Sequence, residues 1–398
     1  MRPAKERSLH TLLQGGASNW KMKKYQITQA SVPKGVIDLG VGQPQVELLP
    51  LKKIKRAADH QLSEANPEIL QYGAQQGSDR LRVALAAFLS DACGLRMDRE
   101  EILITAGISQ ALDLICTLFV KPGDTIIVEE PSYFLALRIF ADHHLNVVGA
   151  PMDRNGLIVE GLEARVKKYR PKLVYTIPVF HNPAGVTLSE KRREALIRLS
   201  NQYDFLVVAD EVYQLLSYGE KPPPPMAAFK GAEGVVSLGS FSKILAPGLR
   251  LGWMQADKKI LERVSMCGLL DSGGGSNPFT AGIVASVIDL GLQKEILDGF
   301  KDTYKRRKAF FGKRLQERIP ELDFRIPEGG FFIWARFKDG RDAGKLLVAA
   351  KQQRVGFQPG CRFSSVQGFN DYLRLCFSYY NRDDLEKGVA RLAKAIAG

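Results

Sequence analysis

Residues 234–250 read GVVSLGSFSKILAPGLR, an apolar segment followed by a cluster of polar side chains. The first six residues have the length and composition of a buried strand. Lys243 then follows two serines, and Arg250 comes seven residues later. A lysine amine can form a Schiff base with an aldehyde, while hydroxyls and a guanidinium can hold a phosphate. The stretch therefore suits a phosphorylated aldehyde cofactor; an ordinary surface lysine in a loop is the alternative.

Strand-length apolar segments alternate with helical patterns through the middle of the chain. The helical patterns include residues 109–120 and 189–203. This alternation predicts an α/β fold with a doubly wound, mainly parallel sheet and helices on both of its faces. Ligands of such sheets bind beyond the carboxyl ends of the strands. The predicted strands are residues 101–105, 125–129, 146–150, 173–177, 205–210 and 234–239.

The C-terminal part of the chain has a different pattern. A basic helix is predicted over residues 298–317, then strands near residues 324–326 and 372–377, and a closing helix over residues 383–397. We therefore predict a smaller α+β domain at residues 298–398 after a large cofactor-binding domain at residues 46–297. Residues 1–45 are predicted to be an N-terminal segment that packs near the small domain.

Composition limits the classes of protein that this chain can belong to. It has 398 residues and a formal charge of +13, but its Lys and Arg residues are dispersed, so we expect no nucleic-acid partner. No apolar run is long enough to span a bilayer, so no membrane role is expected. Five widely spaced cysteines indicate buried thiols in a reducing compartment and no metal site. The location predicted is cytoplasmic, and the basic N-terminus leaves an organellar transit peptide open.

Several polar side chains lie where predicted strands end. Gly107 and Ser109 stand between a strand and a helix, where backbone N–H groups could cradle a phosphate, or Ser109 could simply cap the helix. Asp210 ends a very apolar strand, so its carboxylate needs a cationic partner such as a protonated pyridine nitrogen. Tyr213 could reach the same ring. Asn182 could donate to a ring hydroxyl, although Asn-Pro is also a turn signal.

Taken together, these residues resemble those of fold type I pyridoxal-phosphate enzymes, specifically the class I/II aminotransferases. The motifs HNPAG, ADEVY and SFSKILAPGLRLGW carry the match, which extends from about residue 38 to the C-terminus. Within that family the chain is similar to the kynurenine/2-aminoadipate aminotransferase branch. The resemblance implies pyridoxal 5'-phosphate as cofactor, amino acids and 2-oxo acids as substrates, and a homodimer with shared active sites.

The resemblance also implies a role for each motif residue. Lys243 matches the Schiff-base lysine and the base that moves the Cα proton, and Asp210 matches the partner of the pyridinium nitrogen. Tyr133 matches the aromatic side chain that stacks on the ring. Asn182 and Tyr213 match residues that bond its phenolic oxygen. The phosphate cup is matched by Gly107, Ile108, Ser109, Ser240, Ser242 and Arg250, with Tyr72 reaching the phosphate from the partner subunit.

Substrate residues and rival functions complete the sequence interpretation. Arg374 matches the arginine that binds the substrate α-carboxylate, and Gly42 stands in the substrate-lining stretch. His181 could tune the site or be structural. No second arginine is assigned to a side-chain carboxylate.

A C–S lyase or related eliminating enzyme is the alternative function, and a DNA-binding regulator with an aminotransferase-like domain is a further one. Four phenylalanines near the predicted entrance favour aromatic or long aliphatic substrates: Phe180, Phe331, Phe332 and Phe363.

Overall fold

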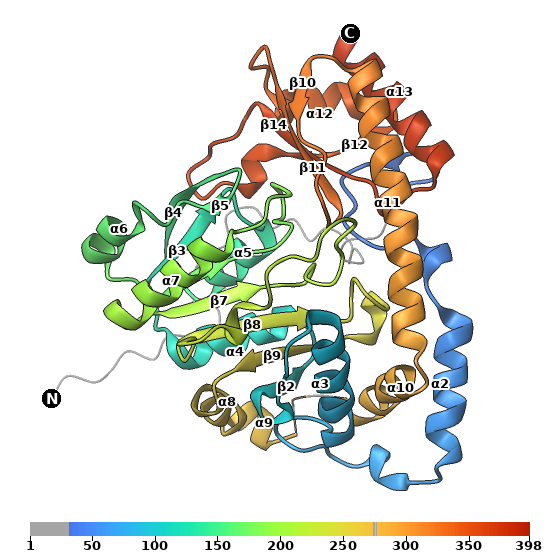
Figure 1. Cartoon of the computed structure of the whole chain (residues 1–398). Coiled ribbons are helices and arrows are strands. Elements are labelled where there is room, and N and C mark those ends of the chain that lie inside the picture. The colour runs from blue at the N-terminus through green and yellow to red at the C-terminus, as the bar shows by residue number, and fades with distance from the viewer. Residues whose placement is uncertain (1–31, 274, 276) are drawn as a thin grey trace, which may run out of the picture.

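The computed structural model describes residues 32–273, 275 and 277–398. The basic N-terminal segment, for which an organellar transit peptide was left open, lies outside these residues. Among the described helices, none combines the length and the apolar composition that a membrane crossing requires. The chain forms two lobes, a larger one built on a broad sheet and a smaller one near the C-terminus (Figure 1).

The large lobe is organised around a mixed sheet that has eight strands within the described part of the chain. Strands β8, β7, β6, β3 and β4 are parallel neighbours, whereas β9 runs antiparallel between β2 and β8. This arrangement confirms the mainly parallel α/β fold predicted from the sequence. In spatial order the strands are β2 (Ile102–Thr105), β9 (Gly252–Ala256), β8 (Val235–Ser240), β7 (Leu206–Asp210), β6 (Leu173–Thr176), β3 (Thr125–Glu130), β4 (Asn146–Asp153) and β5 (Gly156–Leu157).

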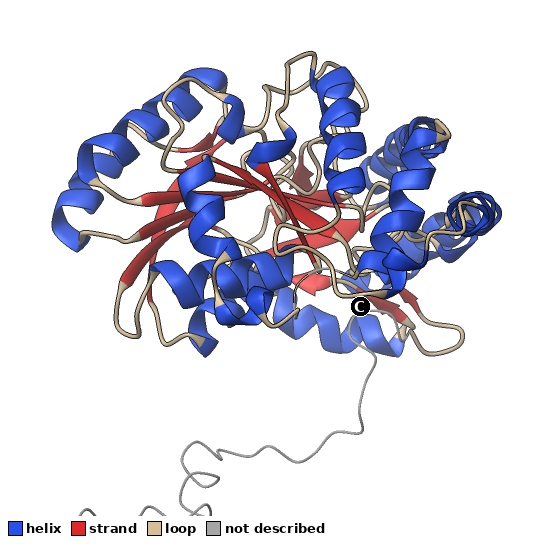
Figure 2. Cartoon of the chain, turned by 90° about the horizontal axis from the view of Figure 1, so that it is seen from below, coloured by secondary structure: helices blue, strands red, loops and turns tan. Residues whose placement is uncertain are grey.

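Helices cover both faces of this sheet (Figure 2). Side chains alternate along each strand, so Ile126 and Val128 pack into one hydrophobic cluster while Ile127 packs into another on the opposite face. Helices α4, α5 and α8 cover the first face, and α6 and α7 cover the second. These helices are α4 (Ile108–Phe119), α5 (Phe134–Asp142), α6 (Leu162–Tyr169), α7 (Glu190–Tyr203) and α8 (Lys258–Ser265), with the short α9 (Gly268–Asp271) following.

The small lobe contains an antiparallel sheet with the order β10-β11-β14-β13. A separate parallel pair joins β1 (Ile37–Asp38) to β12 (Val355–Gly356), so the N-terminal segment contacts the small lobe. The sheet strands are β10 (Leu322–Phe324), β11 (Phe332–Phe337), β13 (Gln358–Pro359) and β14 (Tyr372–Cys376), and helices α12 (Ala343–Gln352) and α13 (Arg382–Ala397) pack in the same lobe.

The remaining long helices are α2 (Leu51–Ser63), α3 (Asp79–Cys93), α10 (Pro278–Asp289) and α11 (Leu292–Arg318). Helices α2, α3 and α10 pack against one another beside the large lobe (Figure 1).

Helix α11 starts earlier than the sequence pattern suggested. The prediction began the helix at residue 298, but Leu292, Ile296 and Leu297 are buried members of the same helix. Its start is set by Gly291, which has a left-handed backbone conformation at φ 70°. The predicted domain boundary at residue 298 therefore falls inside a helix that runs from the small lobe past α2 (Figure 1). The division into three segments stays a prediction.

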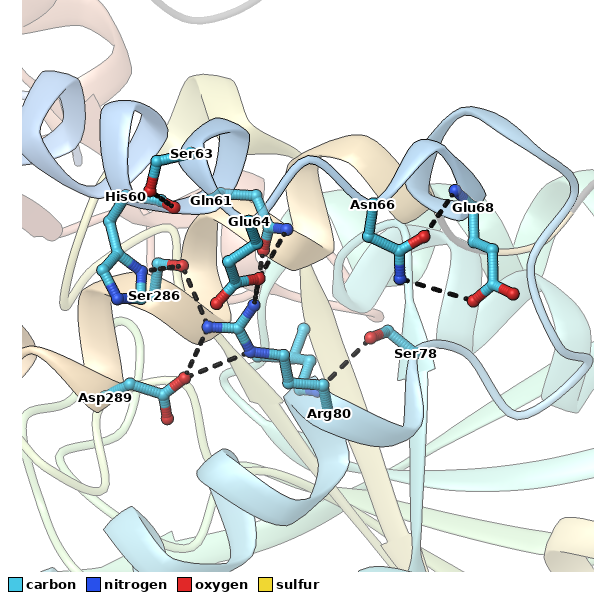
Figure 3. Close-up of polar contacts among 11 residues, drawn as sticks. His60, Gln61, Ser63, Glu64, Asn66, Glu68, Ser78, Arg80, Ser286 and Asp289 are labelled. Carbon is cyan, nitrogen blue, oxygen red and sulfur yellow. Dashed lines mark hydrogen bonds and ion pairs between the residues drawn. The ribbon is translucent and has the colours of Figure 1, made fainter.

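A polar cluster centred on Arg80 connects α2, α3 and α10 (Figure 3). Arg80 donates to Glu64 at 2.5 Å and to Gln61 at 2.9 Å, both near the end of α2. It also donates to Asp289 at 2.9 Å and to Ser286 at 3.2 Å on α10. These groups are partly exposed, so each ion pair adds little stability by itself. The cluster fixes where the three helices meet, away from the candidate site.

Candidate active site

A cavity of about 620 Å³ lies where the ends of the parallel strands of the large lobe meet the small lobe. Side chains from both lobes line it. The sequence predictions are therefore brought together by strands that are far apart in the chain. The predicted site residues that line the cavity are Gly42, Ile108, Ser109, Tyr133, Asn182, Asp210, Tyr213, Ser240, Ser242, Lys243, Arg250 and Arg374.

Lys243 lies just beyond the end of β8 and lines this cavity. Its Nζ donates to the carbonyl oxygen of Gly42 at 2.8 Å. Burial lowers the pKa of Lys243 from 10.5 to about 8, and the positive charges of Arg374 and Arg250 also act to lower it. About a tenth of this amine is therefore neutral at pH 7. The neutral amine is the form that attacks a carbonyl carbon or accepts a proton.

Asp210 ends β7 and is 4% exposed. The hydroxyl of Tyr175 donates to its Oδ2 at 2.8 Å, and the backbone N–H of Val212 donates to its Oδ1 at 3.4 Å. Burial raises the pKa of Asp210 to about 6. A cation bound beside it would favour the ionised carboxylate, so the site suits a protonated ring nitrogen. Tyr175 was missed because a tyrosine within a buried strand resembles an ordinary core residue.

The phosphate end of the cavity is formed at the N-terminus of α4. Gly107 is the residue before this helix and has φ 91°, a conformation that favours glycine. A Cβ at Gly107 would lie 2.8 Å from Nη2 of Arg250, so the absence of a side chain lets the guanidinium approach. The Arg250 Nη2 donates to the carbonyl oxygen of Ala106 at 3.3 Å. With the hydroxyls of Ser109 and Ser242 on the cavity wall, this cradle fits a phosphate dianion.

Arg374, on β14 of the small lobe, is 3% exposed. Its Nη1 donates to Oδ1 of Asn182 at 2.8 Å, and its Nη2 donates to the carbonyl oxygen of Gly40 at 2.7 Å. Its Nε has no hydrogen-bond partner among the described residues. A buried guanidinium without an acidic partner is costly. The geometry therefore suits an anionic substrate group, and the Asn182 side chain keeps its NH₂ group available for a ligand.

His181 has a structural environment that settles which ring nitrogen carries the proton. The backbone N–H of Ala184 donates to Nδ1 of His181 at 3.2 Å, so Nδ1 is an acceptor and Nε2 carries the hydrogen. Nε2 lies 3.1 Å from the buried carboxylate of Glu129. That carboxylate accepts hydrogen bonds from the Thr176 hydroxyl and the Ile177 N–H. His181 therefore holds the loop that carries Asn182 and does not line the cavity.

Two predicted site residues lie outside the cavity. Gly107 stands directly behind it and acts through its backbone conformation, as described above. Tyr72 is 84% exposed, and its ring lies beside Gly273, where a Cβ would come within 2.6 Å of it. Its predicted contact with the phosphate of a partner subunit stays a prediction.

Of the four phenylalanines expected near the entrance, the structure places one on the cavity wall. Phe332 lines the cavity, but Phe180, Phe331 and Phe363 are buried behind its wall. Phe180 packs so closely on Gly329 that a Cβ there would lie 2.3 Å from its ring. These rings fill the contact between the lobes, a burial that local sequence does not reveal. The apolar wall is instead supplied by α5, through Phe134, Leu135 and Ile139.

The fold and this cavity define an α/β enzyme of the pyridoxal-phosphate class, with an amine, a ring partner and a phosphate cradle at the ends of parallel strands. A family model described as aminotransferase class I and II matches residues 34–392. The chain belongs to this family, and it is a pyridoxal-phosphate-dependent aminotransferase that transfers an amino group between an amino acid and a 2-oxo acid.

Similar proteins include three named aminotransferases. Aromatic-amino-acid aminotransferase 1 of Thermococcus litoralis is 35% identical over 374 residues, which cover 91% of this chain and 88% of the relative. The kynurenine aminotransferase of Pyrococcus horikoshii has a solved structure with a TM-score of 0.85 and 35% identity, over 91% of each chain. The alpha-aminoadipate aminotransferase of Thermus thermophilus gives a TM-score of 0.83 and 31% identity, over 93% of this chain and 95% of that one.

Proposed function

We propose that the cavity around Lys243 is the active site in which this aminotransferase carries out both halves of its reaction. The observation that carries the proposal is the position of Lys243. Its amine shares one cavity with the carboxylate of Asp210, the cradle at Arg250 and the buried guanidinium of Arg374. A pyridoxal phosphate molecule needs the amine for its aldehyde, the carboxylate for its ring nitrogen and the cradle for its phosphate. The α-carboxylate of an amino acid substrate needs the guanidinium.

Most of the lining residues would bind the cofactor or the substrate, and Lys243 would transfer the proton. Bound pyridoxal phosphate supplies an aldehyde carbon for the amino group and a ring that accepts electrons from Cα. Ser109, Ser242 and Arg250 would hold the phosphate, and Asp210 would balance the positive charge of the ring nitrogen. Tyr133 would stack on the face of the pyridine ring. Asn182 and Tyr213 would orient the ring through its hydroxyl. Arg374 would bind the substrate α-carboxylate, placing Cα beside the Lys243 amine, which takes the proton.

Cofactor capture by the cofactor-free protein should depend on the protonation of Lys243. Because burial lowers the pKa of this amine to about 8, the neutral fraction increases up to that pH. The capture rate should therefore rise about tenfold per pH unit below pH 8 and level off above it. Stopped-flow absorbance with pyridoxal phosphate would measure the rate. A rate that continues to rise toward the ordinary lysine pKa of 10.5 would contradict this assignment.

The proposed function is tested by adding single amino acids to the cofactor-loaded protein without any 2-oxo acid. Donor amino acids should convert the bound aldehyde form to the amine form, seen as loss of its visible absorption, and should release the matching 2-oxo acid. A 2-oxo acid added afterwards should restore the absorption. Continuous release of ammonia and a 2-oxo acid with the absorption retained would instead indicate an eliminating lyase.

The active unit is proposed to be a homodimer, with Tyr72 of each chain completing the phosphate site of the other. The support is a set of exposed apolar side chains in two segments of the chain, with Leu70 74% exposed in one and Met266 78% exposed in the other. Gln75 joins the first segment to the second through a 2.7 Å hydrogen bond to Asp271. Burying such side chains against a second copy removes apolar area from water. The predicted interface stretch 271–277 includes Gly273, which lies beside the Tyr72 ring, although residues 274 and 276 lie outside the described part.

Mixing two impaired variants, assayed at a cofactor concentration too low to saturate Tyr72→Phe, tests this shared site. Tyr72→Phe should weaken cofactor binding, and Lys243→Ala should lose turnover. In a refolded mixture, hybrid dimers would contain one site with both native residues, so roughly a quarter of the sites should regain activity. Each variant refolded alone is the control. No recovery, with hybrid dimers demonstrated by differently sized tags, would contradict the exchange of Tyr72.

A cytoplasmic location is part of the same proposal, consistent with cysteines that form no disulfide among the described residues.

A further inference from the structure

Tyr175 is a buried tyrosine of β6 whose hydroxyl reaches the carboxylate of Asp210 on the neighbouring strand. In the sheet β6 lies beside β7, and Tyr175 is paired in register with Val208 of β7. Residues two apart on a strand point to the same face, so Tyr175 and Asp210 are diagonal neighbours, a separation that an aromatic side chain can span. The hydroxyl donates to Oδ2 of Asp210 at 2.8 Å.

The ring of Tyr175 is held in place by its surroundings. Tyr175 is fully buried, and its ring packs edge-on against Phe140 of α5, with ring centroids 5.3 Å apart and an angle of 72° between the ring planes. Both residues belong to the hydrophobic cluster on that face of the sheet. A hydroxyl enclosed in this way cannot turn toward water, so its hydrogen must find an acceptor inside the protein. The strand register makes Asp210 that acceptor.

The Asp210 carboxylate in turn needs such a donor. The last torsion of an aspartate side chain is broad, so burial by itself leaves the plane of the carboxylate undefined. Oδ2 accepts the 2.8 Å bond from Tyr175, whereas Oδ1 accepts a longer bond of 3.4 Å from the backbone N–H of Val212. Tyr175 thus supplies the shorter of these two bonds. A hydrogen bond to an ionised oxygen also favours the ionised form of the group.

Several other groups influence the same carboxylate. Burial raises the pKa of Asp210 to about 6, and the hydrogen bond from Tyr175 acts against this increase. Lys243, beyond the end of β8, and His181, in the loop after β6, act in the same direction as that hydrogen bond. The acidic groups that interact with the carboxylate are Glu211, Tyr133 and Tyr213. Removing the Tyr175 hydroxyl retains all of these groups, so its contribution can be measured by itself.

We propose that Tyr175 is a positioning residue for the transamination: its hydroxyl fixes the plane of the Asp210 carboxylate and favours the ionised form that the cofactor requires. The inference rests on the proposed function of the cavity, in which Asp210 balances the charge of the ring nitrogen. A neutral Asp210 carboxyl would not balance that charge, so cofactor binding weakens wherever this group is protonated. Tyr175 therefore extends the pH range of cofactor binding toward acid.

The test measures how tightly the cofactor-free protein binds pyridoxamine 5'-phosphate, which has the ring and phosphate of the cofactor but forms no Schiff base with Lys243. Fluorescence titrations from about pH 5 to 9 give a dissociation constant at each pH. In wild type the affinity should decrease below the Asp210 pKa of about 6. Tyr175→Phe retains the ring but removes the hydroxyl that stabilises the ionised carboxylate. Its loss should move the midpoint of this decrease upward by about one to two pH units.

Tyr304→Phe is the matched control. Tyr304, on α11, is also fully buried, but its hydroxyl has no hydrogen-bond partner in the described part of the chain. This variant should therefore retain the wild-type midpoint. In an Asp210→Asn background, Tyr175→Phe should cause no shift, because the carboxyl on which it acts has been removed. A wild-type midpoint in Tyr175→Phe, or an equal shift in Tyr304→Phe, would overturn the proposal.

Failure of the proposed function would give a different pattern. If the wild-type protein bound no pyridoxamine phosphate at any pH, the cavity would not be the cofactor site. If Asp210→Asn alone left the decrease of affinity in acid unchanged, the carboxylate would have no role at the ring nitrogen. In contrast, a decrease that depends on Asp210 but is the same in wild type and Tyr175→Phe would refute the positioning role of Tyr175 alone.

Discussion

Replacing Lys243 with alanine is expected to reduce turnover roughly 10⁴-fold or more, because one amine both attaches the cofactor and moves the Cα proton. No other lysine lines the cavity among the described residues, so no neighbouring amine can take its place. The variant should still bind pyridoxal phosphate through the cradle at Arg250, but without covalent attachment. Steady-state rates on cofactor-loaded protein, together with mass spectrometry after borohydride reduction, measure both effects.

Two further variants separate the role of this amine from general damage to the fold. Lys243→Arg retains a positive charge but offers no neutral amine, so it should be as inactive as the alanine variant. Lys258→Ala changes an exposed lysine on α8 and should behave as wild type. Normal turnover by cofactor-loaded Lys243→Ala would overturn the assignment of the active-site lysine.

Asp210→Asn is expected to have the second-largest effect. The amide is almost the same size as the carboxylate but leaves a protonated ring nitrogen without its charged partner in a buried site. Breaking a buried pair in this way costs about 3–5 kcal/mol, equivalent to a rate loss of roughly 200- to 5,000-fold if the full cost appears in the barrier. The step to measure is the single-turnover loss of the aldehyde form with a donor amino acid, at saturating cofactor.

The control for Asp210→Asn is Asp204→Asn, which changes an exposed aspartate at the end of α7. Asparagine also tolerates the left-handed conformation of that position, φ 54°, so the fold should be preserved. Asp210→Asn should bind pyridoxal phosphate more weakly, whereas Asp204→Asn should not. An unchanged single-turnover rate in Asp210→Asn would show that the carboxylate has no role at the ring nitrogen.

The predicted strands were recovered because each is a short apolar segment with clear ends. The prediction for residues 205–210 differs by one residue from β7, and that for 234–239 is shifted by one residue from β8. The side chains at these ends had to meet, because the carboxyl ends of neighbouring parallel strands lie at one edge of the sheet. Tyr175 and Glu129 were not predicted, because each lies within an apolar strand. A polar residue inside such a strand does not reveal which residue of another strand it will bond.

The sequence by itself determined the order of strands and helices, the family, and the residues at the strand ends, since these depend on local composition and on short motifs. Only the tertiary structure decided which phenylalanines line the cavity, how Arg374 reaches Asn182, and that Arg362 lines the same cavity. Those contacts join residues up to 192 positions apart, as between Asn182 and Arg374. The physical reason is that burial and side-chain direction depend on how the small lobe packs on the sheet, and no local pattern encodes that packing.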